Sequence, residues 1–352
     1  MRAMSVEINR RNFITISAGG AVLAALPAAP GWSKAAAAKL DYGVASIDPL
    51  YAVAYVALQK GFFGQENLDV NYLNTQSGPR TKQLLAASQI FVGTSGVSDA
   101  VALSIAGKQA KVVFGFDQRV PFANILIRKE DYDAGRIRSV KDLAGKSIAV
   151  TQPQAATWLM ATYIATRSDI VDKTKILGLG DFATMLGALK SGRVDAAIST
   201  ISMIDSAHQE GWGHTLFDVT DEAEWNKVFG GNVPGVGCYI LGETVEKQAD
   251  TVQAFVNAMS KAQGVLNAST AEQISDIIFK DYLGGYERPA ILRALNVYKK
   301  GVWSQSNEIT AESYNRLTGI MSQGKMYTDA ELAKVPFENM IDMKFLAKAK
   351  RA

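Results

Sequence analysis

The chain is 352 residues long, carries 37 basic and 34 acidic side chains, and contains one cysteine, Cys238. This length favours two compact units, because single hydrophobic cores rarely grow beyond about 250 to 300 residues. One cysteine excludes an internal disulfide, and the balance of 33 basic and 33 acidic side chains in residues 39–352 argues against a nucleic-acid-binding protein, which would present a basic face.

The N-terminus has the features of an export signal. Arg10 and Arg11 precede an apolar run at 14–26 that is too short to span a bilayer, and the small residues at 35–38 suit signal peptidase. The arginine pair resembles the signature of twin-arginine export, with the general secretory route as the alternative. We therefore expect residues 1–38 to be a cleaved signal peptide and the mature protein to be periplasmic. Cleavage would leave 33 basic and 33 acidic side chains, because the signal contains four of the basic residues and one of the acidic residues.

Short apolar strands alternate with helical patterns along the mature chain. Strands are predicted at 40–45, 68–73, 90–92, 147–150, 175–177 and 195–198, and helices at 51–60, 79–87, 155–167 and 181–190. Alternation of this kind is typical of an α/β fold with a mostly parallel sheet. Because the same order returns after about residue 147, we predict two lobes of similar design.

The last third of the chain has a helical period. Val252, Phe255, Val256 and Met259 are spaced for one buried helix face. We expect this part to pack back on the first lobe.

Four segments resemble nitrate-, sulfonate- and taurine-type periplasmic binding proteins and their relatives that bind a thiamine-pyrimidine precursor. They are DPLYAVA at 48–54, KGFFGQENLDV at 60–70, DLAGKSIAV at 142–150 and ALKSGRVDAA at 188–197. The resemblance covers about residues 40 to 265. It implies a type II, Venus-flytrap periplasmic binding protein, with a mixed, mostly parallel sheet in each of two lobes.

The resemblance also implies a domain order. Residues 39–122 would begin the first lobe, 123–235 would form the second, and 236–352 would return to the first. The chain would cross between the lobes near 120–128 and again near 233–241. Pro121 lies in the first crossing and several glycines lie in the second, where backbone rotation is easy.

In function, the resemblance implies the solute-binding component of an ABC importer. Such a protein would capture a small organic anion of the sulfonate, taurine, nitrate or carboxylate class and deliver it to permease and ATPase subunits in the inner membrane. We expect a monomer without cofactor, metal or nucleic acid. The alternatives are a binding protein for a thiamine-pyrimidine precursor and a periplasmic ligand sensor.

The sequence argues against an enzyme. The two histidines, His208 and His214, have no acid or second ligand cluster around them, and Cys238 stands in an apolar stretch that indicates a buried thiol. No nucleophile elbow and no phosphate-binding loop is present. The fungal thiamine-pyrimidine synthase shares the implied fold but carries a cysteine-rich motif that is absent here.

Ligand contacts are expected in loops beyond the carboxyl ends of the strands, where open α/β sheets bind ligands. The segment 93–96 is predicted to be a loop before a helix, with the hydroxyls of Thr94 and Ser95 facing the cleft; an ordinary helix cap is the alternative. The segment 154–157 repeats this arrangement in the second lobe. There Trp158 either covers a planar part of the ligand or packs into the core.

Other candidates have competing interpretations. Arg80 is either a clamp on an acidic ligand group or a solvated surface residue, and Arg119 has the same ambiguity. Asp48 is expected to cap the helix that follows, and Tyr51 to stack on the ligand or to pack inward. The complete set of predicted ligand-binding residues is Ser46, Asp48, Tyr51, Arg80, Thr94, Ser95, Gln118, Gln154, Thr157, Trp158, Ser199 and Thr200.

Overall fold

The structure of the protein is a computed structural model that describes residues 36–349. The predicted signal peptide lies outside the described residues except for its last three positions. From residue 37 to the last described residue, 349, the chain forms one compact unit, which contains two five-stranded sheets. Within the described range, no helix has the length and apolar character that crossing a membrane requires.

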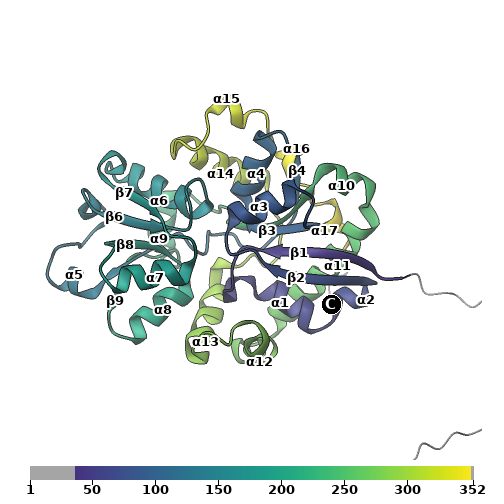
Figure 1. The fold of residues 1–352 in the computed structure, drawn as a ribbon, viewed down its shortest axis with the longest axis horizontal. Helices are drawn as coiled ribbons and strands as arrows, with labels where there is room; N and C mark the ends of the chain where they lie inside the picture. Colours follow the sequence, from purple (N-terminus) through teal and green to yellow (C-terminus); the bar gives the residue numbers. More distant parts are fainter. Residues whose placement is uncertain (1–35, 350–352) are drawn as a thin grey trace, which may run out of the picture. The chain divides into compact units, whose positions relative to one another are not determined.

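The first sheet combines four strands from the start of the unit, labelled β1 to β4 in Figure 1, with β10, which follows the second sheet in the sequence. Its order is β2-β1-β3-β10-β4. The strands are β1 (Ala38–Val44), β2 (Leu68–Asn74), β3 (Val92–Gly96), β4 (Ala110–Gly115) and β10 (Val236–Leu241). β1 runs parallel to β2 and β3, whereas β10 runs antiparallel to β3 and β4. We call this sheet and the helices packed on it the first lobe.

The second sheet is formed by the middle of the chain, with the order β7-β6-β8-β5-β9. Its strands are β5 (Asn124–Arg128), β6 (Ser147–Val150), β7 (Lys175–Gly178), β8 (Ala196–Ser199) and β9 (Gly213–Phe217). β6 is parallel to β7 and β8, and β5 is antiparallel to β8 and β9. This sheet with its helices is the second lobe, and the predicted mixed, mostly parallel sheet in each lobe is confirmed.

Helices follow most strands. In the first lobe they are η1 (Pro49–Tyr51), α1 (Ala52–Gln59), α2 (Phe62–Gln65), α3 (Gly78–Ala86) and α4 (Val97–Ile105). In the second lobe they are α5 (Lys129–Asp133), η2 (Val140–Leu143), α6 (Ala156–Arg167), η3 (Val171–Lys173), α7 (Phe182–Lys190), α8 (Ile201–Gln209) and α9 (Glu222–Phe229). Side-chain caps from Asp181, Thr200 and Asp221 begin α7, α8 and α9.

The C-terminal part is helical, as predicted. It comprises α10 (Gly242–Lys247), α11 (Ala249–Ala268), α12 (Ala271–Tyr282), α13 (Arg288–Val297), η4 (Tyr298–Val302), α14 (Ala311–Gln323), α15 (Asp329–Leu332), α16 (Phe337–Met340) and α17 (Lys344–Lys348). The α11 face that contains Val252 and Phe255 is fully buried. Phe255 packs edge to face on Tyr42 of β1, with ring centroids 5.1 Å apart. The predicted return of this region to the first lobe is therefore confirmed for α11.

Two segments connect the lobes. The first connecting segment, 116–123, joins β4 to β5. The second connecting segment, 218–235, joins β9 to β10 and contains the helix α9. The predicted crossings near 120–128 and 233–241 overlap these segments, and residues 124–128 and 236–241 pair into the sheets. The two segments contact each other, since the backbone N–H of Val233 donates to the carbonyl of Gln118 at 2.9 Å.

Candidate functional site

A narrow cavity of about 40 Å³ lies between the lobes, and we call it the interlobe cavity. Its polar wall in the first lobe comprises Ser46, Tyr51, Gln76, Ser77, Ser95 and Asp99. The second lobe contributes Thr151, Ala155, Ala156, Thr157 and Phe182, and the first connecting segment contributes Phe122. The cavity therefore has walls from both lobes, at the ends of strands where α/β sheets bind ligands.

Two helices begin at the interlobe cavity without a side-chain cap. α4 follows Gly96 in the first lobe, and α6 follows Ala155 in the second lobe. The two helix starts are in close contact, because a Cβ atom added to Gly96 would lie 2.6 Å from the Cβ of Ala156. The first turn of a helix carries backbone N–H groups and a partial positive charge. The cavity is therefore suited to an acceptor or acidic group on a ligand.

Asp99 in the first turn of α4 is the one acidic side chain that lines the interlobe cavity among the described residues. It is 1% exposed, and its Oδ2 accepts a hydrogen bond from Ser95 Oγ at 2.7 Å. Its Oδ1 has no hydrogen-bond partner. Burial raises the pKa of Asp99, although Lys82 and the hydrogen bonds from Ser95 and Gly96 act in the opposite direction.

Asp99 is not among the ligand-binding residues predicted from the sequence. An acid in the first turn of a helix is ordinary, because it complements the helix dipole. The signal that identifies Asp99 is spatial: Gly78 of α3 packs against its carboxylate, and a Cβ at Gly78 would lie 2.2 Å from Asp99 Oδ2.

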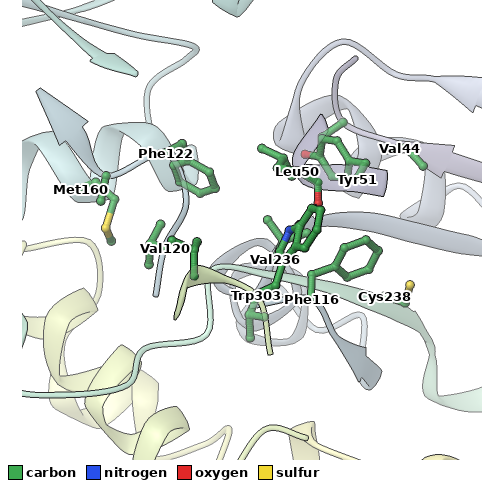
Figure 2. Packing of buried hydrophobic residues seen from close by; sticks show 14 of the residues in the cluster. Val44, Leu50, Tyr51, Phe116, Val120, Phe122, Met160, Val236, Cys238 and Trp303 are labelled. Atoms are coloured by element: carbon green, nitrogen blue, oxygen red, sulfur yellow. Dashed lines mark hydrogen bonds between the residues drawn. The ribbon is translucent and has the colours of Figure 1, made fainter. Parts of the chain in front are cut away.

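Three predicted residues lie at the start of the first lobe. Ser46 and Tyr51 line the interlobe cavity, and Tyr51 packs edge to face on Phe116, with ring centroids 6.2 Å apart. Figure 2 shows Tyr51 and Phe116 among the buried side chains, together with Phe122 of the first connecting segment. Asp48 is fully buried and does not line the cavity.

Asp48 acts as a helix cap, as predicted. Its Oδ1 accepts hydrogen bonds from the backbone N–H of Leu50 at 2.9 Å and from the hydroxyl of Tyr298 at 3.1 Å. Its other oxygen accepts a hydrogen bond from Ser202 in α8 of the second lobe. Burial raises the pKa of Asp48 against the effect of these donors. Asp48 therefore joins the two lobes at a point outside the cavity.

The predicted loop at 93–96 was wrong, because these residues continue strand β3. Thr94 pairs with Val44 of β1 on one side and with Cys238 of β10 on the other. Its Oγ1 lies 2.9 Å from Tyr42 Oη and 3.1 Å from Cys238 Sγ, inside the core of the first lobe. Ser95 does line the interlobe cavity, and its Oγ lies 2.7 Å from Tyr239 Oη.

In the second lobe, Thr157 lines the interlobe cavity, and Gln154 and Trp158 are not among the lining residues. Thr157 Oγ1 accepts a hydrogen bond from the backbone N–H of Thr151 at 3.0 Å. Gln154 is exposed, with a positive φ of 61°, and Trp158 packs against the core, half-buried. Gln152, which is not among the predicted residues, reaches across to the first lobe, where its Nε2 donates to Ser77 Oγ at 3.3 Å.

Neither predicted arginine lines the interlobe cavity. Arg80 is exposed on α3. Arg119 forms an ion pair with Glu222 of α9, with a distance of 3.2 Å from Nη2 to Oε2. The proposed guanidinium clamp therefore has no support from the geometry.

The remaining candidates also lie outside the cavity lining. Gln118 Nε2 donates to the carbonyl of Gly301 at 3.1 Å. Ser199 Oγ donates to the carbonyl of Ala197 at 3.0 Å, and Thr200 caps α8 by accepting from the N–H of Met203 at 3.4 Å. The hydroxyls of Ser199 and Thr200 thus bond the backbone at the end of β8 and the start of α8.

Two further observations concern chemistry. Between residues 36 and 349, no group of three or more histidine, cysteine or acidic side chains is placed to hold a metal ion. Burial raises the pKa of the Cys238 thiol to about 12. A thiol with this pKa is a poor nucleophile at neutral pH.

Comparison with known proteins gives a family and a fold. The model of a family described as NMT1/THI5 like matches residues 48–269. YtlA of Bacillus subtilis (strain 168) is 23% identical over 303 residues, which are 85% of this chain and 86% of that protein.

Solved structures share the fold. The ligand-binding component of an ABC-type import system from Staphylococcus aureus is 15% identical, with a TM-score of 0.70 over 90% of this chain and 100% of that chain. The alkanesulfonate-binding protein SsuA from Xanthomonas axonopodis pv. citri, solved with MOPS bound, is 17% identical, with a TM-score of 0.65 over 90% of this chain and 99% of that chain. At these identities the likeness shows the fold alone.

Proposed function

The chain belongs to the NMT1/THI5-like family, and from this membership we propose that it is the solute-binding component of an ABC importer. In this proposal it binds a small solute in the periplasm and passes it, chemically unchanged, to permease and ATPase subunits in the membrane. The observation that carries the proposal is the interlobe cavity, which takes its walls from both lobes. The names of similar structures support it, because one is a component of an ABC-type import system and another binds an alkanesulfonate.

The geometry supports capture by closure. A ligand that contacts Ser95 in one lobe and Thr157 in the other gains interactions that neither lobe provides alone. A ligand shifts a conformational equilibrium only by its difference in affinity between the states. Contacts to both walls supply that difference, so the bound ligand favours the closed arrangement.

The first turns of α4 and α6 have no side-chain cap, so their backbone N–H groups favour a ligand with an acidic or strongly accepting group. This agrees with the sulfonate, nitrate, taurine and carboxylate classes that the sequence suggested. The helix N-termini replace the arginine clamp in this role, because backbone N–H groups at a helix start bind anions without a basic side chain.

A pyrimidine-type ligand is the second candidate, and one observation favours it. Tyr51, Phe122 and Phe182 bring three aromatic rings to the small cavity. Aromatic walls suit a planar ring, since ring pairs gain more than their buried area alone.

A thermal-shift screen of the exported protein tests the proposal. The set contains alkanesulfonates, aliphatic and aromatic carboxylates, nitrate and aminopyrimidines. Binding at a hundredfold excess over Kd stabilises the folded state by about 2.7 kcal/mol, so a ligand should raise the melting temperature clearly. Recovery of the compound unchanged after incubation distinguishes binding from catalysis. If no class raises the melting temperature, the proposed function is contradicted for these solutes.

A ligand-dependent complex with a membrane partner tests the role in import. Permease and ATPase genes that lie beside this one would supply the partners for co-expression. The loaded protein should bind the detergent-solubilised transporter and stimulate its ATP hydrolysis. Binding to a receptor instead would support a sensor.

A further inference from the structure

We infer that the ion pair between Arg293 and Asp205 is a latch between the lobes, which forms on closure and sets how tightly the solute is held without touching it. This inference rests on the proposed function and adds to it the residues that hold the closed arrangement. Arg293 is then a positioning residue, which acts on the ligand only through the second lobe.

The helix that carries Arg293 belongs to the first lobe. α13 packs on α12 and on η1. Tyr298, directly after α13, donates its hydroxyl to Asp48, the residue that caps η1. Lys299 then donates to two backbone carbonyls at the end of α11, at 2.5 and 2.7 Å. A movement of the first lobe therefore carries Arg293 with it.

Asp205 belongs to the second lobe. It lies on α8, which follows β8 and packs on β9. Arg293 Nε donates to Asp205 Oδ1, and Arg293 Nη2 donates to Oδ2 at 2.6 Å. A guanidinium that bonds both carboxylate oxygens makes a stronger and more directional contact than a single hydrogen bond. Three residues earlier on α8, Ser202 donates to the buried carboxylate of Asp48. One face of α8 is therefore bonded to the first lobe at two points.

Burial distinguishes this ion pair from another that joins distant parts of the fold. Lys325, just after α14, lies 4.0 Å from Asp172 of η3, and these side chains are 70% and 89% exposed. The side chains of Arg293 and Asp205 are 42% and 14% exposed. Exposed ion pairs contribute little, because water and salt screen them. The pair between α13 and α8 is therefore the stronger of the two.

The latch lies away from the ligand. Neither Arg293 nor Asp205 is among the residues that line the interlobe cavity, and Asp48 and Ser202 are not among them either. The apparent affinity of a ligand depends on the fraction of molecules that adopt the arrangement that binds it. A contact that forms only in the closed arrangement raises that fraction. Breaking the latch should therefore lower affinity although every contact to the ligand remains.

Charge reversal at Arg293 tests the inference, with a matched control on the same helix. Arg293→Glu sets two carboxylates against each other across the lobes. Arg288→Glu breaks the ion pair of Arg288 with Asp276, whose partners lie on α13 and α12. Both variants are titrated by calorimetry with the solute found in the screen. We expect Arg293→Glu to bind at least about fivefold more weakly than the wild type, and the control to stay within about twofold.

Two further measurements separate a latch from a merely structural residue. Stopped-flow kinetics should show faster dissociation for Arg293→Glu, by about the factor lost in affinity, and little change in association. Urea unfolding should show similar losses of stability for Arg293→Glu and Arg288→Glu. Adding Asp205→Arg to Arg293→Glu restores opposite charges, and it should return the affinity to within about threefold of the wild type.

The outcomes separate the inference from the proposed function. If a solute binds and Arg293→Glu holds it as tightly as Arg288→Glu does, the inference is overturned and the proposed function stands. The same conclusion follows if the charge-swapped protein folds and binds as weakly as Arg293→Glu. If Arg293→Glu does not fold, the comparison of Arg293→Gln with Arg288→Gln decides. If none of the screened solutes binds, the proposed function is overturned and the inference with it.

Discussion

The carboxylate of Asp117 accepts a hydrogen bond from the backbone N–H of Gly235 at 2.6 Å, and so joins the two segments that connect the lobes. Its second oxygen accepts from the N–H of Val236 at 2.9 Å. Asp117 is buried in the first connecting segment, and Gly235 ends the second connecting segment. Any rotation of one lobe against the other therefore takes place around a pair of segments that are held together.

Replacement of Asp117 by asparagine should destabilise the protein. The amide places an NH₂ group where the carboxylate has an acceptor, so one of the two backbone N–H groups loses its partner. We expect the free energy of unfolding to fall by about 1–3 kcal/mol. Urea unfolding measures this loss, with Asp281→Asn as the control for an exposed acid. An unchanged midpoint of urea unfolding would show that the hydrogen bonds of Asp117 to the second connecting segment do not stabilise the protein.

Replacement of Gly96 by alanine should weaken ligand binding without unfolding the protein. The backbone of Gly96 has a φ of −55°, which alanine adopts easily. The new methyl group would lie 2.6 Å from the Cβ of Ala156 in the second lobe, so it obstructs closure. We expect at least a tenfold loss of affinity, or about 1.4 kcal/mol. Titration with the solute found in the screen gives this value.

Gly187→Ala is the matched control for that variant. Gly187 lies in α7, and an added Cβ would meet no atom within 4 Å. Alanine in a helix is favoured over glycine by roughly 0.5–1 kcal/mol, so the control should bind normally and be slightly more stable. Equal affinities for the two variants would contradict closure between α4 and α6.

Thr157→Ala should reduce affinity to a smaller extent. Thr157 lines the interlobe cavity, and its hydroxyl is 2.7 Å from Thr151 Oγ1. Its loss removes a hydrogen bond at the wall, which is worth about 0.5–1.5 kcal/mol. Thr318→Ala, whose hydroxyl bonds a carbonyl in α14, is the control. If both variants bind like the wild type, Thr157 does not contact the ligand.

Asp195 should make stability depend on pH. Burial opposes ionisation of Asp195, but hydrogen bonds from the N–H and hydroxyl of Ser147, both at 2.8 Å, hold its pKa below the usual value. A lowered pKa contributes stability that is complete above the unfolded-state pKa and is lost as the pH falls through the folded-state pKa. Because Asp195 is partly exposed to solvent, we expect this contribution to be about 1 kcal/mol.

Urea unfolding of the wild type and Asp195→Asn over a pH series tests this expectation. The difference in stability should be largest near neutral pH and should shrink in acid. A difference that does not change with pH would mean that the charge of Asp195 has no role.

The sequence predicts the helices and strands well wherever a local pattern of residues determines them. Residues 147–150 form a strand with the predicted bounds, because an apolar run with clear flanks is sufficient there. The strand at 92–96 was predicted at 90–92, with a loop at 93–96, because the glycine, threonine and serine residues of VGTSG are typical of loops. Its partners on both sides, β1 and β10, come from distant parts of the chain, and local propensity contains no information about them.

The site is predicted less completely, for the same reason. Ser46, Tyr51, Ser95 and Thr157 follow from the rule that ligands bind beyond strand ends, and they line the interlobe cavity. Arg119 looked available in the sequence, but its partner Glu222 comes from α9. Asp99 was missed because its significance lies in an absent hydrogen bond, which appears only when the neighbours of the carboxylate are known.

Small-angle scattering of the exported protein, with and without the solute identified in the screen, tests the central claim most directly. The structure has its lobes in contact, through Asp48 with Ser202 and through Arg293 with Asp205, whose Nη2 and Oδ2 lie 2.6 Å apart. We expect the saturated protein to match the scattering of this closed arrangement and the solute-free protein to have a larger radius of gyration. An unchanged radius at saturation, confirmed by titration of the same sample, would contradict binding by closure of the two lobes.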